Sequence, residues 1–177
     1  PGNWSLDNYG QVLVATIKDG KTFTWNAGAA NARTIRASTS TSGASTSNNP
    51  TKSRLTQVSD RDRHLFHFGT ETTIGDSLTQ DPMFIRFSNQ EDLNDYAPTA
   101  VNTAGTFRLD KGNKIMGAVS GKDYTLVLTD TSAYVIQFVG PPFTFSVRQV
   151  GTNCGLIGQH ALSYSDGKVF WMSGEGG

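Results

Sequence analysis

The sequence has a single cysteine and no net charge. Cys154 alone excludes an intrachain disulfide and any zinc cluster built from cysteines, and we expect a small buried or half-buried thiol. Lys and Arg together number 15, as do Asp and Glu. A protein that grips nucleic acid normally carries a basic excess, because neutralising phosphates supplies most of that affinity. The balance predicts DNA contact that is at most non-specific and no attachment to an anionic membrane.

Long apolar runs and helical periodicity are also missing. No run approaches the ~20 residues that span a bilayer, and no signal peptide opens the chain. No window of about 12 residues shows the i, i+3, i+4, i+7 apolar pattern of a helix without Gly, Pro or a β-branched run. The chain begins at Pro1 and ends soon after a strand-like run. We therefore expect it to be a fragment of a longer polypeptide.

Short β-prone runs separated by Gly, Asn and Asp take the place of helices. The expected strands cover residues 11–17, 22–25, 64–68, 83–87, 124–128, 133–138, 143–148, 161–164 and 168–172. The dipeptides Asp19-Gly20 and Asp166-Gly167 each separate two of these runs. Asp-Gly favours a hairpin there, because a type I′ turn needs positive φ at its central positions.

The spacing of the apolar runs indicates the architecture. Comparable runs start near positions 12, 64, 124 and 168, an average of about fifty residues apart. Propeller blades of four strands recur every ~40–50 residues, and a blade cannot bury its faces without neighbours. We therefore expect residues 1–177 to form a single all-β module of antiparallel, propeller-like blades. A β-sandwich is the alternative, because it also has short strands with frequent turns.

One segment has a different composition. Residues 38–49 read STSTSGASTSNN and contain no large apolar side chain. Nothing in the segment offsets the entropy of ordering it, so we expect a flexible Ser/Thr-rich insertion between strands.

Candidate chemical groups are few. His64 and His67 are three residues apart in a strand-like run, so they should point to opposite faces and cannot share a metal. For these two and for His160 we expect solvent-facing or hydrogen-bonded rings. Residues 89–95 hold three carboxylates, which could suit calcium but lack the EF-hand order and are more typical of a solvated turn.

Motifs of enzyme catalysis are missing from the sequence. We find no Gly-x-Ser-x-Gly elbow, no local Cys-His signature and no Gly-x-x-x-x-Gly-Lys phosphate loop. The sequence therefore predicts no catalytic residue, no metal and no cofactor. A hydrolase on a propeller scaffold would need convergent acids that the sequence alone does not locate.

Several stretches taken together resemble a family of virion proteins from tailed bacteriophages. They are Trp4–Gly10, Leu13–Thr16, Val58–His64, Asp81–Ser88, Asn102–Gly105, Gly140–Phe145 and Val169–Met172. The resemblance covers nearly the whole chain except the Ser/Thr insertion. Ile85–Ser88 followed by Tyr96-Ala97-Pro98 also resembles a blade pattern in which a later aromatic precedes Pro, with Tyr96 where the family often has Trp.

What the resemblance implies is a structural role. Related tail nozzle or tube proteins carry a β-propeller and assemble as rings through which DNA leaves the capsid. We therefore expect a non-enzymatic component of a phage tail, located in the virion. Its partners would be other tail subunits arranged around the DNA exit path, and the longer propeller-bearing protein would form a homo-oligomeric ring. No catalytic residue carries over from the family.

Three surface segments are the candidate interfaces with partners. They are the sign-alternating turn Asp60–Arg63, the acidic loop Gln90–Tyr96 and the corner Gly140–Phe143. The individual candidates are Asp60, Arg61, Asp62, Arg63, Glu91, Asp92, Asp95, Pro141, Pro142 and Phe143. The alternative function is a carbohydrate- or receptor-binding β module that exposes Trp4, Trp25 and Trp171 for stacking, although core packing explains Trp171 better.

Overall fold

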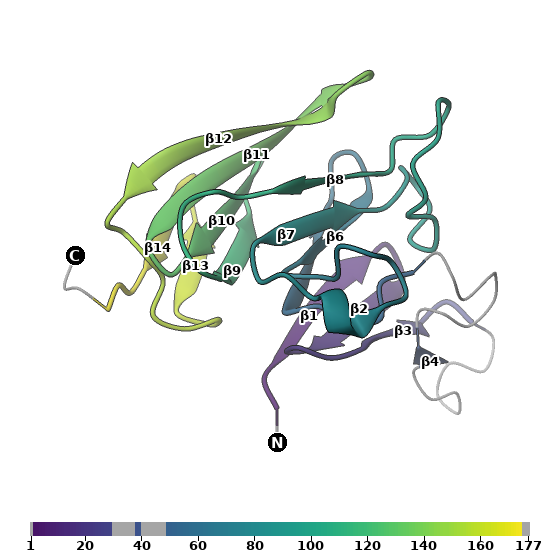
Figure 1. The fold of residues 1–177 in the computed structure, drawn as a ribbon, viewed down its shortest axis with the longest axis horizontal. Coiled ribbons are helices and arrows are strands. Elements are labelled where there is room, and N and C mark those ends of the chain that lie inside the picture. The colour runs from purple at the N-terminus through teal and green to yellow at the C-terminus, as the bar shows by residue number, and fades with distance from the viewer. Residues whose placement is uncertain (1, 30–37, 40–48, 175–177) are drawn as a thin grey trace. The chain divides into compact units, whose positions relative to one another are not determined.

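The computed structural model describes residues 2–29, 38–39 and 49–174, and contacts divide the chain into two compact units. The first is Pro1–Arg108 and the second is Leu109–Gly177. Figure 1 shows the elements of both units. The sequence predicts a single module, whereas the contacts form two units.

The first unit contains two four-stranded sheets in which every neighbouring pair is antiparallel. The first sheet has the order β1(Trp4–Tyr9), β2(Val12–Ile17), β3(Thr22–Asn26) and β4(Ser38–Thr39). The second has the order β5(Leu55–Ser59), β6(His64–Phe68), β7(Phe84–Phe87) and β8(Gly105–Arg108), with a 3₁₀ turn at Ser77–Thr79 between β6 and β7. Each strand therefore pairs with its neighbours in sequence.

The second unit contains one four-stranded sheet of the same kind and one two-stranded sheet. Its four-stranded sheet consists of β9(Ile115–Ser120), β10(Thr125–Thr129), β11(Ser132–Gly140) and β12(Thr144–Thr152). A two-stranded sheet of β13(Leu162–Ser165) and β14(Lys168–Trp171) follows. Register shifts interrupt the β11–β12 ladder near Ala133 and near Phe138, as β-bulges do.

The all-β prediction is confirmed, and its periodicity has a structural cause. The apolar runs near positions 12, 64, 124 and 168 are β2, β6, β10 and β14, which are the second strands of the four successive sheets. Consecutive antiparallel meanders are compatible with blade-like or sandwich packing. No α-helix occurs in the described residues. No helix in this part of the chain is long and apolar enough to cross a membrane.

The two Asp-Gly turns differ. Asp166 and Gly167 both have positive φ, 47° and 78°, as the predicted type I′ turn requires. At the first hairpin Asp19 has φ 56°, whereas Gly20 is not in the left-handed region. Both turns join paired strands, so the hairpin predictions are confirmed even though the first turn is of another type.

Each unit has its own hydrophobic core. In the first, Tyr9, Val14, Val58 and Leu65 pack together, and all five residues of β6 are buried. In the second, Leu126, Leu128, Ala133 and Leu156 form the core beneath the β13–β14 hairpin. Continuous burial of β6 is typical of a strand covered on both faces.

Most of the predicted Ser/Thr insertion lies outside the described residues, which resume at position 49. At its start, residues 38–39 form β4 and pair with β3. At its end, Asn49 is buried, and its amide nitrogen lies 3.2 Å from the side-chain oxygen of Asn94. Both described ends of the segment are thus attached to the first unit.

Candidate assembly surfaces

The turn Asp60–Arg63 and the acidic loop form one continuous charged surface. The backbone of Glu91 donates to the carbonyl of Arg63 at 2.9 Å, and the Arg63 guanidinium lies 3.6 Å from the Glu91 carboxylate. The Tyr9 hydroxyl also donates to the Arg63 carbonyl at 2.9 Å. Burial and the nearby Glu91 carboxylate raise the pKa of Tyr9 to about 12, so this hydroxyl stays protonated and keeps donating. Two of the three predicted interface segments therefore lie together.

Asp62 is an exception within the predicted interface. Its neighbours Asp60, Arg61 and Arg63 are exposed, whereas Asp62 is only 4% exposed. Its two carboxylate oxygens lie 2.5 Å from the Ser59 hydroxyl and 2.5 Å from Nδ1 of His64. Its expected place on the exposed turn is therefore wrong, because the tight turn directs this carboxylate inward to two hydrogen-bond partners.

His64 connects that carboxylate to a second loop. Its Nε2 lies 2.8 Å from the Thr103 hydroxyl, so Asp62, His64 and Thr103 have the order of an acid–histidine–hydroxyl relay. The hydroxyl of Thr103, however, also accepts from the Gln90 backbone at 2.8 Å and contacts the Asn89 side chain at 3.2 Å. With these contacts the hydroxyl holds the acidic loop in place. The expectation of hydrogen-bonded histidines is confirmed here.

His67 lies on the opposite face of β6, as its spacing predicts. Its Nδ1 lies 2.8 Å from the Ser53 hydroxyl and its Nε2 lies 2.9 Å from the Tyr96 hydroxyl. Burial, with a contribution from the charge of Arg86, lowers the pKa of His67 to about 3. Because the ring is neutral, it donates from one nitrogen and accepts at the other. Tyr96 is fully buried above it, which fits the expected aromatic residue before Pro98.

Two carboxylates of the acidic loop accept hydrogen bonds from the loop itself or from the segment that follows it. Asp92 accepts from the Asn94 backbone at 2.9 Å, and Asp95 accepts from the Ala97 backbone at 3.3 Å and the Asn102 side chain at 3.1 Å. In the described part of the chain no group of three or more His, Cys, Asp or Glu side chains is placed to hold a metal. These contacts are those of an ordered surface turn.

The first sheet has a half-exposed apolar side that is not among the predicted interface segments. We call it the outer face, and it consists of Trp4, Leu6, Leu13, Ala15, Ile17, Phe23 and Trp25. The strand register aligns Leu6 with Ala15 and Phe23. Trp4 contacts Phe23 with ring centroids 6.0 Å apart and is itself 41% exposed.

The opposite side of the same sheet is covered by the second sheet. There the backbone amides of Thr56 and Val58 in β5 donate to the side chains of Ser5 at 3.1 Å and Asp7 at 2.8 Å. Thus β1 presents polar side chains to the neighbouring strand on one side and apolar ones to the outer face. The period-2 alternation of Trp4-Ser5-Leu6-Asp7 is the sequence signal that could have located the outer face.

The predicted corner Gly140–Phe143 joins β11 to β12 at the end of a long hairpin. Pro141, Pro142 and Phe143 are exposed, and Phe143 retains 80% of its surface. Gly140 and Thr144 adopt positive φ on either side of the prolines. The corner is therefore an apolar tip, as an interface role would require.

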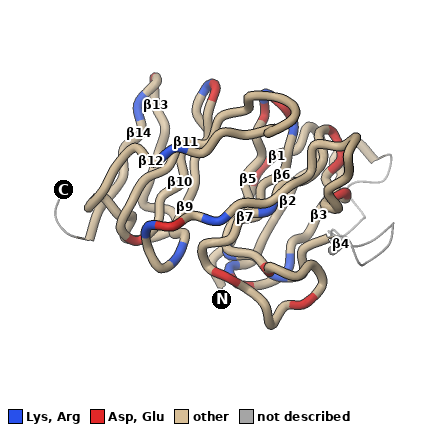
Figure 2. The backbone as a smooth tube through the Cα atoms, turned by 45° about the horizontal axis from the view of Figure 1, so that its top comes forward, with Lys and Arg blue, Asp and Glu red and all other residues tan. Residues whose placement is uncertain are grey.

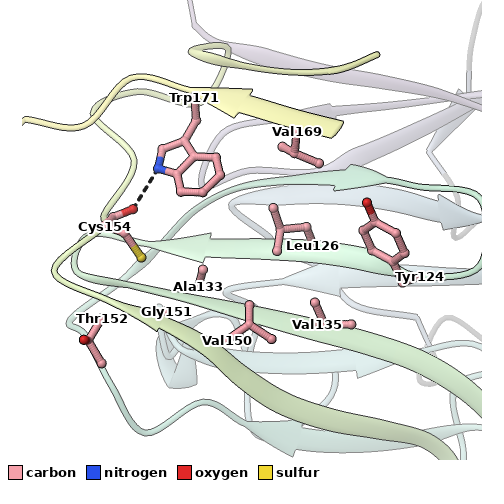
Figure 3. Close-up of a pocket in the computed structure, with 10 residues that line it drawn as sticks. All are labelled: Tyr124, Leu126, Ala133, Val135, Val150, Gly151, Thr152, Cys154, Val169 and Trp171. Carbon is pink, nitrogen blue, oxygen red and sulfur yellow. Dashed lines mark hydrogen bonds between the residues drawn. The ribbon is translucent and has the colours of Figure 1, made fainter. Parts of the chain in front are cut away.

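A pocket of about 490 Å³ lies within the second unit, as Figure 3 shows. Leu126, Val135 and Val150 line it on the sheet side, and Val169 and Trp171 of β14 line it on the other. The Trp171 indole donates to the Cys154 carbonyl at 2.9 Å, which fixes the ring against the core as expected. Burial raises the pKa of the half-buried Cys154 thiol.

Charge is distributed evenly over these surfaces. Figure 2 shows basic and acidic residues spread through the loops and strands of both units, and neither sign dominates a large region of the described chain. This distribution agrees with the balanced composition.

Comparison with known proteins identifies no relative. No family model matches this chain, and no curated protein is significantly similar to it. The likeness to phage tail proteins therefore rests on the sequence motifs and stays a hypothesis.

Proposed function

We propose that this protein is a non-enzymatic structural component of a phage tail. It assembles with neighbouring virion subunits around the DNA exit path and, in the full-length protein, contributes to a homo-oligomeric ring. The observation that supports an assembly role most strongly is the outer face. Seven apolar residues, among them two tryptophans and one phenylalanine, share this half-exposed side of a sheet whose other side is already covered.

The outer face suits another β-sheet as its partner. The outer face mixes aromatic and aliphatic side chains from three strands. Sheets that pack face to face with another sheet have such a face. Completing the burial of a large apolar side chain stabilises a contact by up to about 1.5–3 kcal/mol. Trp4 and Leu6 are 41% and 65% exposed, so a partner that covers them would add a substantial part of this burial free energy to the contact.

The charged surface formed by Arg63 and Glu91 supplies the specificity that an apolar face lacks. Ion pairs this exposed contribute little to stability, typically ~0–1 kcal/mol. Charges of both signs at the edge of an interface nevertheless select the partner and its register. Asp60, Arg61, Arg63, Glu91 and Asp92 are the exposed residues available for this role.

The virion location is tested on phage particles. Antibodies raised against this chain should label the tail tip in electron micrographs, and peptides from it should appear in mass spectra of purified virions. Particles that lack the polypeptide would refute the tail role.

The assembly role is tested separately by Leu6→Asp in the full-length product. We expect this change to abolish rings in electron micrographs, because it places a carboxylate in the apolar face. Leu78→Asp is the matched control, since Leu78 is 94% exposed in the 3₁₀ turn. Equal assembly of the two variants would contradict the use of the outer face.

One observation favours carbohydrate or receptor binding as a second candidate. Trp4 and Trp25 lie on the same face of the first sheet, with Phe23 close to Trp4. Aromatic rings on a flat sheet can stack on sugars, but the aliphatic residues between them favour a protein partner. Reproducible glycan-array binding that is lost on Trp4→Ala and Trp25→Ala would support this candidate.

A further inference from the structure

The β11–β12 hairpin is longer than the rest of its sheet. The ladder between β10 and β11 ends where Thr125 pairs with Ile136, whereas the β11–β12 ladder continues to the pair Gly140 and Thr144. The last part of the hairpin is therefore only two strands wide. Figure 1 shows this part running past the ends of β9 and β10.

The side chains at the end of this hairpin are apolar and exposed. Val139 and Phe143 are 56% and 80% exposed, and the two prolines at 141–142 are exposed as well. We call residues 139–143 the apolar tip. Exposed apolar residues that gather at one point, unlike single ones, mark a surface that another apolar medium covers.

The composition of the hairpin changes with distance from the apolar tip. Behind the tip Phe138 and Phe145 pack edge to face, with ring centroids 5.8 Å apart. The next pair along the ladder, Gln137 and Ser146, is exposed, polar and uncharged. Arg148 follows two residues later in β12, is exposed, and is the first charged residue after Asp130. An apolar end, a neutral polar band and then a cation match the hydrocarbon, the interface and the phosphates of a lipid leaflet.

The backbone of the apolar tip also suits an apolar medium. An amide that enters hydrocarbon without an acceptor is costly, because no water is there to bond it. Pro141 and Pro142 have no amide hydrogen, and the Phe145 amide donates to the Phe143 carbonyl at 2.7 Å. The residues on either side of the turn are paired in the β11–β12 ladder. The tip therefore carries few amide donors that need water.

The charge pattern favours lipid over a protein as the occupant. Protein interfaces have rims on which charges select the partner and its register, but residues 131–147 contain no charged side chain. No acidic residue occurs between Asp130 and Asp166, so the hairpin carries nothing that lipid phosphates would repel. The chain as a whole has no net charge, which argues for a zwitterionic surface and against an anionic one.

The way in which successive sheets pack also leaves this end of the hairpin outside their contacts. The β13–β14 hairpin packs on the face of its neighbouring sheet, against the core that contains Leu126 and Leu128 of β10. A sheet that packs face to face in this way covers the faces of the strands. The apolar tip lies instead beyond the strand ends of β9 and β10.

We propose that the apolar tip inserts into the surface of a zwitterionic phospholipid bilayer. Phe143 lies among the upper parts of the acyl chains, and Arg148 lies near the phosphate groups. The insertion is shallow and reversible, because it is made by a few apolar side chains and does not span the bilayer. This inference goes beyond the assembly role proposed above and does not depend on it.

Flotation with vesicles of pure phosphatidylcholine tests the proposal on the full-length product. We expect the protein to float with the vesicles on a density gradient. Its partition coefficient should stay within about twofold when NaCl rises from about 0.1 M to about 0.5 M, because salt does not screen apolar burial. Protein that stays at the bottom of the gradient, or that is released by salt, would overturn the proposal.

A pair of variants locates the contact. Phe143→Asp should lower the partition coefficient at least about tenfold, since burying one large apolar side chain changes a binding constant by roughly one to two powers of ten. Val101→Asp is the matched control and should stay within about twofold of the original protein, because Val101 is 96% exposed but lies in a loop of the first unit. Equal flotation of the two variants would contradict insertion through the apolar tip.

Photochemical crosslinking identifies what covers position 143. The full-length product with p-benzoylphenylalanine in place of Phe143 is irradiated with the same vesicles. We expect the peptide that contains position 143 to gain the mass of one phosphatidylcholine molecule. A crosslink to another segment of the same chain, to a second copy or to another tail protein, with no lipid adduct, would overturn the proposal. Neither outcome bears on whether the polypeptide is present in virions, which tests the proposed function independently.

Discussion

Lowering the pH from 7 to 5 should destabilise the first unit through His67 by about 2 kcal/mol. The ring is completely buried between Ser53 and Tyr96, and burial lowers its pKa to about 3. In the unfolded chain the same ring has a pKa near 6.5. Above pH 6.5 both states are neutral, so the full stability is present there. As the pH falls below 6.5 only the unfolded state gains a proton, and each pH unit then lowers the unfolding free energy by about 1.4 kcal/mol until the pH approaches 3.

The measurement compares the wild-type chain with His67→Gln. Hydrogen exchange of the β6 amides gives the unfolding free energy of the first unit at each pH. We expect the wild-type chain to lose about 2 kcal/mol more than the variant between pH 7 and pH 5, because Gln has no group that titrates in this range. All other acids and bases are common to both proteins and cancel in the difference.

A direct NMR titration keeps this prediction testable even if the variant is poorly folded. The Cε1–H resonance of His67 in the folded wild-type chain should not shift between pH 7 and pH 5. A midpoint near 6.5 would refute the reasoning, because it would mean that the ring is solvated and that its two hydrogen bonds do not fix the neutral form.

Two further predictions concern a buried hydrogen bond and the packing around a glycine. Tyr96→Phe should lower the unfolding free energy by about 1–3 kcal/mol in urea denaturation, because it leaves the buried Nε2 of His67 without its partner; unchanged stability would show that the bond contributes nothing. Gly155→Ala should destabilise the second unit by at least about 1–3 kcal/mol, since an added Cβ would overlap the carbonyl of Asp130, whereas Gly158→Ala has open space around it and should unfold at nearly the original temperature. Similar melting temperatures for the two alanine variants would contradict this packing.

The sequence predicted β2, β6, β10 and β14 from their apolar runs, and it also predicted β3, β7, β11, β12 and β13. β2, β6 and β10 lie between two neighbouring strands, and they and β14 were found because they are built from adjacent β-prone residues. The strands β1, β4, β5, β8 and β9 were missed. β5 has only two apolar residues and no aromatic, and β9 contains Gly117, where a side chain would collide with Leu156. Gly117 is needed because Leu156, a residue distant in sequence, packs against it. The residues next to Gly117 in the sequence do not indicate this contact.

Some features of the candidate sites were predictable from the sequence, and others were not. Exposure of the Gly140–Phe143 corner and of Arg63 and Glu91 was predictable, because turn residues and charges favour the surface. The inward position of Asp62 was not predictable. The alternating charges of residues 60–63 do not indicate which carboxylate contacts the buried His64. The contacts of His67 were equally hidden, because its partners Ser53 and Tyr96 are 14 and 29 residues away in the sequence.

The pairing of each strand with its neighbours in sequence also bears on how the chain folds. Only short loops must close to form the first hairpins, and closing a short loop takes a small fraction of the time needed to bring distant segments together. Each meander can therefore form as soon as its four strands have left the ribosome, without waiting for later residues. Folding would then advance along the chain in steps of one sheet.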